Sequence, residues 1–408
     1  MINKKYPLFN PDIFHDACGV GFVATSNGKP DPKVLPLALS AMKRLTHRGA
    51  KAYDGNSGDG SGILVDIPKS FFKSYLLDKH SIKISKNDTL VIASIFAKNI
   101  SVKTIKSSFL NLTEKEKIDF VSLRVVPIDD NVLGDFSKQS LPKIMQLIFL
   151  TKAKNTAKLE RKLYLIRKKI ERDLYPRYKR FYICSFSSKT IVYKGLLSSD
   201  QLVKFYKDLT NDLFVVKVVL FHERFSTNTF SSWEMAQPFR MIAHNGEFNT
   251  IKGSRLWMNS REGNMESKVW KKNIDFLKPI TKQTGSDSES FDNSAEFLKI
   301  SGRDIFDTMM IMIPDSYEQT EKYYNNKKMN KMMRDYFIYH ENFMKPWDGP
   351  AAIVFTDGDF VGAKMDRNGL RPLRYSITKD GLIIMASEAG IVDIDDDNII
   401  SNYHMKSE

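Results

Sequence analysis

The sequence predicts one large α+β domain built mainly from antiparallel strands, and three observations support this class. Short apolar segments with β-strand character are spread along all 408 residues, and helical patterns lie between them. The C-terminal part is a succession of short strands with Asp357-Gly358 and Asp380-Gly381 at turns, and Asp-Gly pairs are typical of antiparallel hairpins. No internal repeat or low-complexity linker divides the chain, and a domain with insertions can use its whole length.

The N-terminal half alternates between predicted strands and helices. Apolar residues recur at helical spacing between Leu35 and Leu45, and Arg48-Gly49 is a helix-stop signal. The glycine-rich run 55–62 precedes a strand, whereas a phosphate-binding loop would open a helix, so a dinucleotide site is not favoured. Strands are predicted over residues 18–25, 63–67, 90–97, 123–128, 181–186, 215–221 and 309–313.

Two longer helices are predicted farther along the chain. One has a single apolar face and a strongly basic polar face, and it ends before Pro176. We expect that polar face to be a solvated surface rather than a binding site. The second helix is predicted over residues 330–343, and strands follow over 351–355, 360–365, 373–377 and 382–386. The first helix carries Leu159, Leu163, Ile166 and Ile170 on its apolar face and Arg161, Lys162, Arg167, Lys168 and Lys169 on its polar face.

Cysteine usage and hydropathy exclude several classes of protein. Cys18 and Cys184 are too few for a disulfide framework, which fits a reducing compartment. Neither lies in a cysteine-rich run, so we expect no zinc ribbon and no iron–sulfur cluster within this chain. Residues 1–17 lack the apolar stretch of a secretory signal, and no run of about 18 apolar residues occurs. We therefore expect a cytoplasmic protein that does not span a membrane.

The formal net charge is +14, from 62 basic and 48 acidic residues. Basic residues cluster over 152–180 and 322–334, a pattern that can indicate a nucleic-acid partner. Neither cluster belongs to a recognisable nucleic-acid-binding motif, and lysine is abundant throughout the chain. We therefore expect these lysines on solvated faces and no nucleic-acid partner.

Cys18 opens a β-rich run behind only 17 residues, which is typical of a nucleophile that becomes the mature N-terminus. Cutting the Ala17–Cys18 bond would give one residue both a thiol and a free α-amine. That amine has an ordinary pKa of about 7.7–8.0, which suits a general base at neutral pH. A thiol paired with a base is an arrangement for acyl transfer. Residues 1–17 are accordingly expected to be a propeptide that is removed. The alternative is a half-buried strand cysteine.

Two polar segments contain residue types that do not suit a plain core. Arg224 follows a predicted strand, with the hydroxyl of Thr227 nearby in sequence, and an arginine there can hold a carboxylate through two parallel hydrogen bonds. Asn245 and Gly246 lie at another strand end. They can offer a side-chain amide and a backbone N–H to one oxygen, which is the composition of an oxyanion hole.

A third segment, 285–289, precedes a helix, and its Asp287 could neutralise an ammonium group. The alternative for this segment is an ordinary helix N-cap, because Ser and Asp start helices routinely. Taken together, a cysteine nucleophile, a carboxylate clamp, an oxyanion hole and an ammonium acceptor describe a site for an α-amino acid with an amide side chain. Glutamine fits that description.

The chain resembles the N-terminal glutamine amidotransferase domain of the glutamate synthase large subunit, a class II amidotransferase of the N-terminal-nucleophile hydrolase type. The Arg224 and Trp233 segments favour this group over purine, asparagine and glucosamine-phosphate amidotransferases. Two departures, Glu223 and Phe248 in place of Gln and Ile, are not expected to touch chemistry. The matching runs are 18–24 (CGVGFVA), 45–50 (LTHRGA), 58–64 (GDGSGIL), 224–229 (RFSTNT), 233–239 (WEMAQPF), 244–247 (HNGE), 286–290 (SDSES), 347–352 (WDGPAA) and 366–372 (DRNGLRP).

This resemblance implies a four-layer αββα sandwich of two antiparallel sheets, with the amidotransferase domain over residues 18–408. It implies hydrolysis of L-glutamine to glutamate and ammonia, with the ammonia used for reductive amination of 2-oxoglutarate by an NADPH-type glutamate synthase. Cys18, Asn245 and Gly246 are the expected catalytic residues. Arg224, Thr227 and Asp287 are the expected substrate-binding residues.

The resemblance also implies cofactors and partners that lie outside this chain. Similar enzymes carry FMN and a 3Fe-4S cluster in regions that follow the amidotransferase domain, and NADPH and FAD are bound by a small partner subunit. We expect no cofactor and no metal in this chain itself. Its expected partners are L-glutamine and either the missing synthase region or the small subunit. Two alternatives stay open: a truncated relic or regulatory glutamine-binding module, and an amidotransferase for another acceptor.

Overall fold

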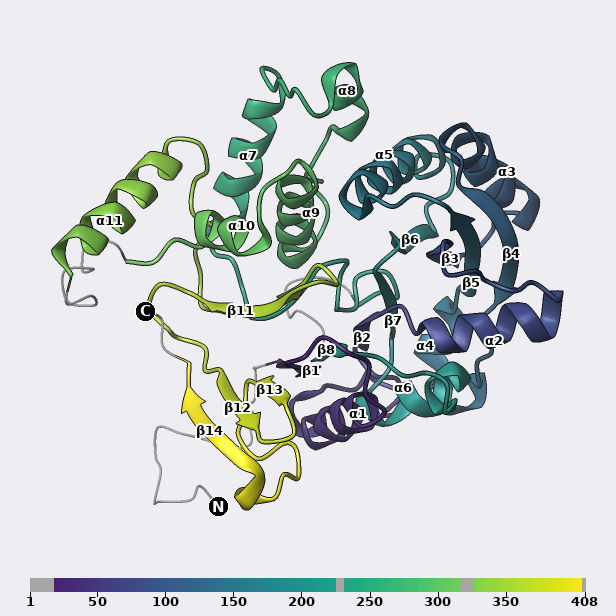
Figure 1. Ribbon diagram of the computed structural model, residues 1–408, viewed down its shortest axis with the longest axis horizontal. Helices are drawn as coiled ribbons and strands as arrows, with labels where there is room; N and C mark the ends of the chain where they lie inside the picture. Colours follow the sequence, from purple (N-terminus) through teal and green to yellow (C-terminus); the bar gives the residue numbers. More distant parts are fainter. Residues whose placement is uncertain (1–17, 225–230, 317–325, 406–408) are drawn as a thin grey trace.

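The strands of this protein are antiparallel throughout the part of the chain that the structure describes (Figure 1). This computed structural model describes residues 18–224, 231–316 and 326–405, and in them strands and helices alternate along the sequence. Every strand pairing recorded for these residues is antiparallel. The predicted α+β class with antiparallel sheets is confirmed.

The largest sheet has seven strands and joins both ends of the described chain. Its strand order is β14-β12-β13-β1-β8-β2-β7, so the C-terminal strands lie beside the first strand (Figure 1). The central position of β1 and β8 places them among the most protected strands of the fold. The bounds are β1 Gly19–Thr25, β2 Ser61–Asp66, β7 Thr190–Gly195, β8 Val218–Glu223, β12 Arg374–Thr378, β13 Leu382–Ala386 and β14 Ile399–His404.

A second β-layer consists of two smaller sheets rather than one. The three-stranded sheet has the order β11-β10-β9, and the four-stranded sheet has the order β4-β5-β3-β6. The first packs against β1 and β8, and the second packs against β7. The bounds are β3 Thr89–Ala97, β4 Asp119–Val125, β5 Lys143–Thr151, β6 Phe181–Ser187, β9 Ile242–Gly246, β10 Ala351–Thr356 and β11 Val361–Met365.

Helices cover the outer faces of both β-layers. On the seven-stranded sheet, α1 packs on β1 and β8, and α6 packs on β2. On the other side, α3 and α5 cover the four-stranded sheet, while α9 and α10 lie over the three-stranded sheet. The helices are α1 Val34–Arg44, α2 Lys69–His80, α3 Val102–Thr113, α4 Asp135–Ser140, α5 Thr156–Leu174, α6 Ser199–Phe205, α7 Ile251–Glu262, α8 Ile274–Leu277, α9 Asp287–Ile300, α10 Ile305–Met312 and α11 Lys327–Glu341.

Side-chain alternation along the inner strands explains this layering. In β3, Val91 and Ile95 belong to the core under the helices, whereas Ile92 and Phe96 belong to the core between the β-layers. Successive residues of a strand point to opposite faces, so a strand that is apolar on both faces must be covered on both. Such strands specify a sandwich in which helices lie outside two β-layers, in agreement with the expected αββα arrangement.

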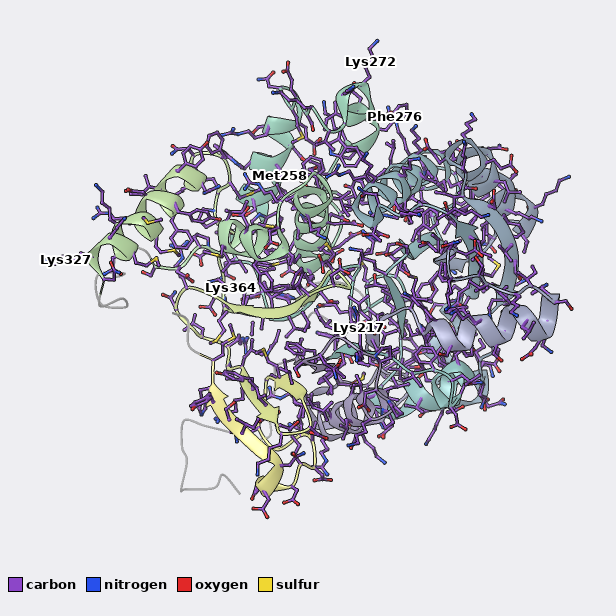
Figure 2. The ribbon with its side chains drawn as sticks, viewed as in Figure 1. Lys217, Met258, Lys272, Phe276, Lys327 and Lys364 are labelled. Carbon is purple, nitrogen blue, oxygen red and sulfur yellow. The ribbon has the colours of Figure 1, made fainter. Side chains whose placement is uncertain are left out.

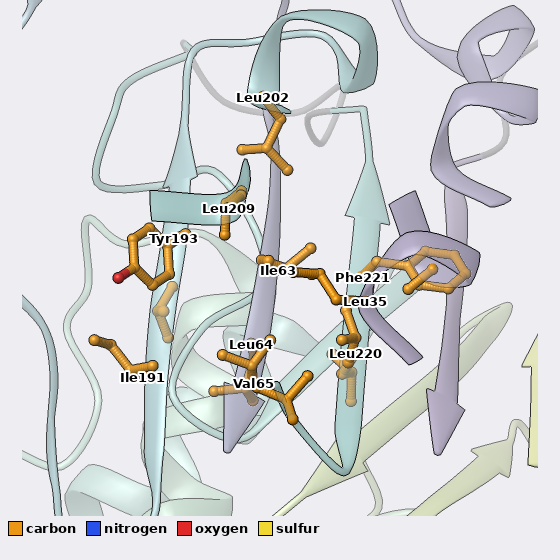
Figure 3. Packing of buried hydrophobic residues seen from close by; sticks show 14 of the residues in the cluster. Leu35, Ile63, Leu64, Val65, Ile191, Tyr193, Leu202, Leu209, Leu220 and Phe221 are labelled. Carbon is orange, nitrogen blue, oxygen red and sulfur yellow. The ribbon is translucent and has the colours of Figure 1, made fainter. Parts of the chain in front are cut away.

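The core between the layers is centred on β2 and its neighbours (Figure 3). The labelled side chains of β2, β7 and β8 are 1% exposed or less, and close packing of this kind gives a platform that tolerates little movement. The strands that reach the candidate site are built on this platform. The side chains shown around β2 include Ile63, Leu64 and Val65, with Ile191 and Tyr193 of β7 and Leu220 and Phe221 of β8.

Two local predictions were wrong, each because of tertiary packing. Residues 309–313 were expected to form a strand, but they lie in and just beyond α10, whose N-cap Asp304 accepts a hydrogen bond from Phe306 N at 2.8 Å. A short apolar run that is buried cannot be assigned to strand or helix by periodicity alone. Arg167 was expected on a solvated face of α5, but it is 2% exposed and pairs with Glu171 and Glu296.

Candidate active site

Strand register and sheet packing bring Cys18, Arg224 and the Asn245-Gly246 pair together. Gly19 pairs with Glu223 across β1 and β8, so the start of one strand and the end of the other are adjacent. Cys18 and Arg224 are the next residues beyond that pair. The strand β9 ends at Asn245 and Gly246, and β9 and β10 pack on β1. Three segments that are distant in sequence therefore meet at one edge of the sandwich.

The Cys18 nitrogen donates a hydrogen bond to Asn245 Oδ1 at 3.1 Å. This is the nitrogen that would become the α-amine after cleavage before Cys18. Burial raises the pKa of the Cys18 thiol to about 11, and the positive charge of Arg224 and a backbone hydrogen bond from Gly246 act in the opposite direction. The thiol is consequently protonated at neutral pH, and it needs a base to act as a nucleophile.

Asn245 and Gly246 are the residues expected to supply the two hydrogen-bond donors of an oxyanion hole. Asn245 is 1% exposed, its Oδ1 is used by Cys18, and its Nδ2 has no partner among the described residues. A buried amide donor without a partner is costly unless something occupies the space it faces. Gly246 has φ +120°, and a Cβ there would lie 1.7 Å from the carbonyl oxygen of Pro350, so only glycine fits.

Arg224 lies directly after β8 in a strained backbone conformation. Its φ is +89°, in the left-handed region that non-glycine residues rarely adopt, and its N–H donates to Gly60 O at 2.9 Å. Strain of this kind persists where the surrounding structure holds it, and it is common at functional sites. Thr227 and the predicted propeptide, residues 1–17, lie outside the described residues.

Asp287 is joined to the Asn245 segment through the backbone. It is the first residue of α9, and its Oδ2 accepts a hydrogen bond from Phe248 N at 3.1 Å. The neighbouring Ser286 is the N-cap and accepts from Glu289 N at 3.0 Å. The N-cap alternative is therefore correct for Ser286, while the Asp287 side chain reaches across to the segment that follows β9.

Sequence reasoning missed a connection between His244 and Ser288 that supports this segment. His244 Nδ1 lies 3.0 Å from Ser288 Oγ, and Ser288 Oγ donates to Asp287 Oδ1 at 3.2 Å. The imidazole stacks on Phe248 with ring centroids 4.9 Å apart. Burial lowers the pKa of His244, which favours the neutral ring at neutral pH. The only sequence signal was that these residues lie within or beside the runs that resemble the family.

Asp59 and Arg371 were also missed, although both lie in those runs. The negative charge of Asp59 raises the pKa of the Cys18 thiol, and the positive charge of Arg371 lowers it. The two residues are far from Cys18 in sequence, so no local pattern could have placed them near it. Their opposing charges adjust the electrostatic environment of the thiol, in addition to the dominant effect of burial.

Glu223, one of the two departures from the family pattern, is predicted to make stability depend on pH. It is 1% exposed, and burial together with the charge of Asp59 raises the pKa of its carboxyl well above the ordinary value. A raised carboxyl pKa lowers folded-state stability as pH rises from the unfolded-state pKa, about 4.3, to the folded-state pKa. Glu223→Gln cannot ionise, so it should be more stable than the native protein at pH 7–8 and nearly equal to it at pH 4.

Thermal unfolding at both pH values would check this, with the exposed Glu266→Gln as the control. Each unit of difference between the folded-state and unfolded-state pKa corresponds to about 1.4 kcal/mol in the free energy of unfolding. Each kcal/mol of that free energy changes the melting temperature by at most about 2–4 °C. A difference between Glu223→Gln and the native protein that is the same at pH 4 and pH 8 would contradict the assignment.

The described residues do not fit an iron–sulfur cluster or a metal ion. Cluster ligation needs thiolates, and burial raises the pKa of the Cys184 thiol to about 12. No group of three or more His, Cys, Asp or Glu side chains in the described part of the chain is arranged to hold a metal. Within the same residues, no helix is both long enough and apolar enough to cross a bilayer.

Comparison with known sequences identifies similar proteins over nearly the whole chain. The family described as glutamine amidotransferases class-II matches residues 18–407. A ferredoxin-dependent glutamate synthase of Antithamnion sp. is 42% identical over 394 residues, which are 95% of this chain and 25% of that protein. The glutamate synthase [NADH] of Saccharomyces cerevisiae is 40% identical over 419 residues, covering 100% of this chain and 19% of that protein.

The glutamate synthase [NADPH] large chain of Bacillus subtilis is 38% identical over 401 residues, covering 97% of this chain and 26% of that protein. The chain thus spans about a quarter or less of the length of these relatives. The names of the relatives include ferredoxin, NADH and NADPH types, so the similarity does not single out one electron donor.

Proposed function

Because this chain belongs to the class-II glutamine amidotransferases and matches the amidotransferase portion of glutamate synthases, we propose that it hydrolyses L-glutamine with Cys18 as the nucleophile. The observation that carries this proposal is that the two polar atoms of the Asn245 side chain are available for two different tasks. Asn245 Oδ1 accepts the hydrogen bond of the Cys18 nitrogen, and Asn245 Nδ2 has no partner among the described residues. One amide can thus hold the base and stabilise an oxyanion.

The chemistry requires the α-amine that cleavage before Cys18 would expose. As the Cys18 sulfur bonds to the side-chain carbonyl carbon of glutamine, the thiol proton moves to that amine. The oxyanion that forms accepts hydrogen bonds from Asn245 Nδ2 and Gly246 N–H. The carbon–nitrogen bond breaks, the amine returns the proton to the leaving nitrogen, and ammonia departs. Water then attacks the thioester, which releases glutamate and restores the thiol.

Recognition of the amino-acid part of glutamine is assigned to charged groups around this centre. Arg224 would bind the α-carboxylate through two parallel hydrogen bonds, and Asp287 would bind the α-ammonium. Thr227 follows Arg224 closely in sequence and would contribute its hydroxyl. These roles are consistent with the position of Arg224 beside Cys18 and with the contact between Asp287 and the residues after Asn245.

In its biological context, we propose that the ammonia is used to aminate 2-oxoglutarate, and the relatives' names, which are those of glutamate synthases, support this proposal. FMN, the iron–sulfur cluster, NADPH and FAD would then be held by regions or chains other than this one, and no step above uses them. NADPH is one of three electron donors that the relatives' names allow. A regulatory glutamine-binding module and an amidotransferase for another acceptor are the competing functions.

A glutaminase assay on protein of known N-terminus tests the proposal. Mass spectrometry would identify molecules that begin at Cys18 and molecules that begin at Met1, and ammonia release would be measured for each. We expect release only from protein that begins at Cys18. Protein that begins at Met1 and hydrolyses glutamine at the same rate would reject the mechanism. Glutamine binding without ammonia release by processed protein would favour the regulatory module.

Arg224→Ala and Asp287→Ala are each predicted to raise the KM for glutamine by one to three orders of magnitude. Removing one partner of a buried charge pair costs about 2–5 kcal/mol, and tenfold in affinity corresponds to about 1.4 kcal/mol. Steady-state kinetics would measure KM. Arg44→Ala and Asp393→Ala are the controls, because Arg44 and Asp393 form an exposed ion pair with each other. An unchanged KM in either site variant would remove that residue from glutamine recognition.

A further inference from the structure

A cavity of about 390 Å³ lies between α5, α8 and the start of α9. This volume is within the range of small-molecule sites. Phe276 of α8, labelled in Figure 2, is part of its wall, and Glu171 and Glu289 are the two acidic residues that line it. Its lining includes six basic residues, Lys168, Arg172, Lys179, Arg240, Lys278 and Lys282. The lining therefore carries a strong excess of positive charge.

Half of these basic residues already have acidic partners. Arg240 pairs with Glu296 at 3.0 Å, Lys278 with Asp275 at 2.9 Å, and Lys282 with Glu289 at 3.2 Å. These pairs hold three of the side chains that line the cavity. Their charges are largely balanced within the protein, so they do not by themselves call for a ligand.

The other three basic residues make no ion pair with a described carboxylate. Lys168 Nζ donates to the carbonyl oxygen of Pro279 at 3.2 Å, and Arg172 Nη1 donates to that of Asp275 at 2.9 Å. Burial lowers the pKa of Lys168 to about 8, although the negative charge of Glu171 acts in the opposite direction. Lys168 is half-buried and makes no ion pair within the described part of the chain, so an anion in the cavity would stabilise its charged form.

Aromatic side chains hold the basic residues around the opening. The guanidinium of Arg172 lies 5.8 Å from the ring centroid of Phe276, and Lys282 Nζ lies 4.9 Å from that of Tyr175. Cations over aromatic faces are held in place electrostatically. The cavity is therefore lined by both positive groups and aromatic rings, and its volume suits a compact organic anion better than a long polymer.

We propose that this cavity binds a small multivalent anion, either a phosphate ester or a polycarboxylate, through Lys168, Arg172, Lys179 and Lys282. The four basic residues line one small volume, so a single ligand must carry two or more negative charges to interact with several of them at once. Planar guanidinium groups match carboxylate and phosphate oxygens equally well, so the geometry selects the charge and size of the ligand.

Binding here would be coupled to the glutamine site, a step that rests on the proposed function. Lys282 is the basic residue nearest in sequence to α9, and its partner Glu289 lies in the first turn of that helix with Asp287. Arg255 holds the segment between them through the carbonyl oxygens of Gln283 and Ser286, each at 3.0 Å. An anion that shares Lys282 would weaken its pair with Glu289 and shift the turn that carries Asp287.

Calorimetric titration of the full chain, without glutamine, tests the site. The ligands are pyrophosphate and citrate, with sodium chloride at matched ionic strength. Lys168→Gln/Lys179→Gln is the site variant. Lys138→Gln/Lys162→Gln removes the same charge from exposed positions outside the cavity and is the control. We expect the native protein to bind at least one ligand with 1:1 stoichiometry. The Kd should rise at least about tenfold in the site variant, which corresponds to about 1.4 kcal/mol of binding free energy. In the control variant the Kd should rise less than twofold.

The outcomes separate the possibilities. Binding of pyrophosphate alone assigns a phosphate ester, and binding of citrate alone assigns a polycarboxylate. The proposed site would be overturned if ligand binding were weakened equally in both variants. It would also be overturned if the measured heat of titration depended only on ionic strength. Melting temperatures of the variants would show that they are folded. Native protein that binds 1:1 but has no glutaminase activity would support the site and reject the proposed function. An unchanged KM at saturating anion would overturn the coupling alone.

Discussion

Cys18→Ser is expected to lower glutamine turnover by at least about 10³-fold, because loss of a nucleophile that forms a covalent intermediate removes the main reaction path. A serine hydroxyl is far less nucleophilic than a thiol. Burial raises the pKa even of the Cys18 thiol to about 11, so the same surroundings would not favour ionisation of a hydroxyl in its place. Turnover would be measured as ammonia release from protein that begins at residue 18. Cys184→Ala is the matched control, because this second cysteine is buried in β6 and should leave turnover per folded molecule nearly unchanged.

The pH dependence of the same assay identifies the base that serves Cys18. An α-amine with a pKa of about 7.7–8.0 must be unprotonated to accept the thiol proton, so kcat/KM should rise with pH and level off above about pH 8. If the thiol ionised without a base, the rate would continue to rise toward its pKa of about 11. A profile that still climbs between pH 9 and pH 10 would contradict the role of the amine. Turnover that survives in Cys18→Ser would reject the nucleophile itself.

Asn245→Ala is expected to reduce kcat by about 10²–10³-fold while KM for glutamine changes only a few-fold. Removing one oxyanion donor costs about 2.7–4 kcal/mol in the transition state, and such a donor contributes little to ground-state binding. The loss should be at the upper end of this range, because Asn245 also accepts the hydrogen bond of the Cys18 nitrogen at 3.1 Å. Asn245→Asp should be no better, since a carboxylate offers no donor and repels the oxyanion.

The alternative is that Asn245 only shapes the turn before Gly246, as asparagine often does. Under that alternative, Asn245→Ala would lower the melting temperature, and turnover per folded molecule would be nearly normal. Melting temperature and kcat should therefore be measured on one preparation. Asn402→Ala on the exposed surface of β14 controls for loss of an asparagine elsewhere. A destabilised variant with full turnover would show that the oxyanion assignment is wrong.

Much of the local structure was predictable because it depends on nearby residues. The apolar spacing in α5 identified Leu159, Leu163, Ile166 and Ile170 as buried, and all four are. The Asp-Gly pairs marked real turns, with φ of +86° at Gly358 and +83° at Gly381. The strand ends that carry Arg224 and Asn245 were also expected from sequence. Each of these features is determined within a few residues, where propensity and turn chemistry act directly.

Where local patterns failed, a distant contact decided the outcome. The run 309–313 lies in and just beyond α10, because burial against the three-stranded sheet outweighed its strand-like composition. Arg167 left the solvated face of α5 because Glu296, on another helix, provides an acidic partner for it. Neither the packing of α10 on that sheet nor the pairing of Arg167 with Glu296 could be known before the elements were packed against one another.

For the candidate site, the sequence by itself determined the residue types: a cysteine after a short N-terminal segment, an arginine after a strand, and an Asn-Gly pair at another strand end. Only the tertiary structure decided that they meet, through the register of Gly19 with Glu223 and the packing of β9 on β1. It also brought the charges of Asp59 and Arg371 to the Cys18 thiol and left Cys18 half-buried. The physical reason is that burial and electrostatic interaction depend on distance in space, and residues separated by hundreds of positions acquire that distance only when the sheets assemble.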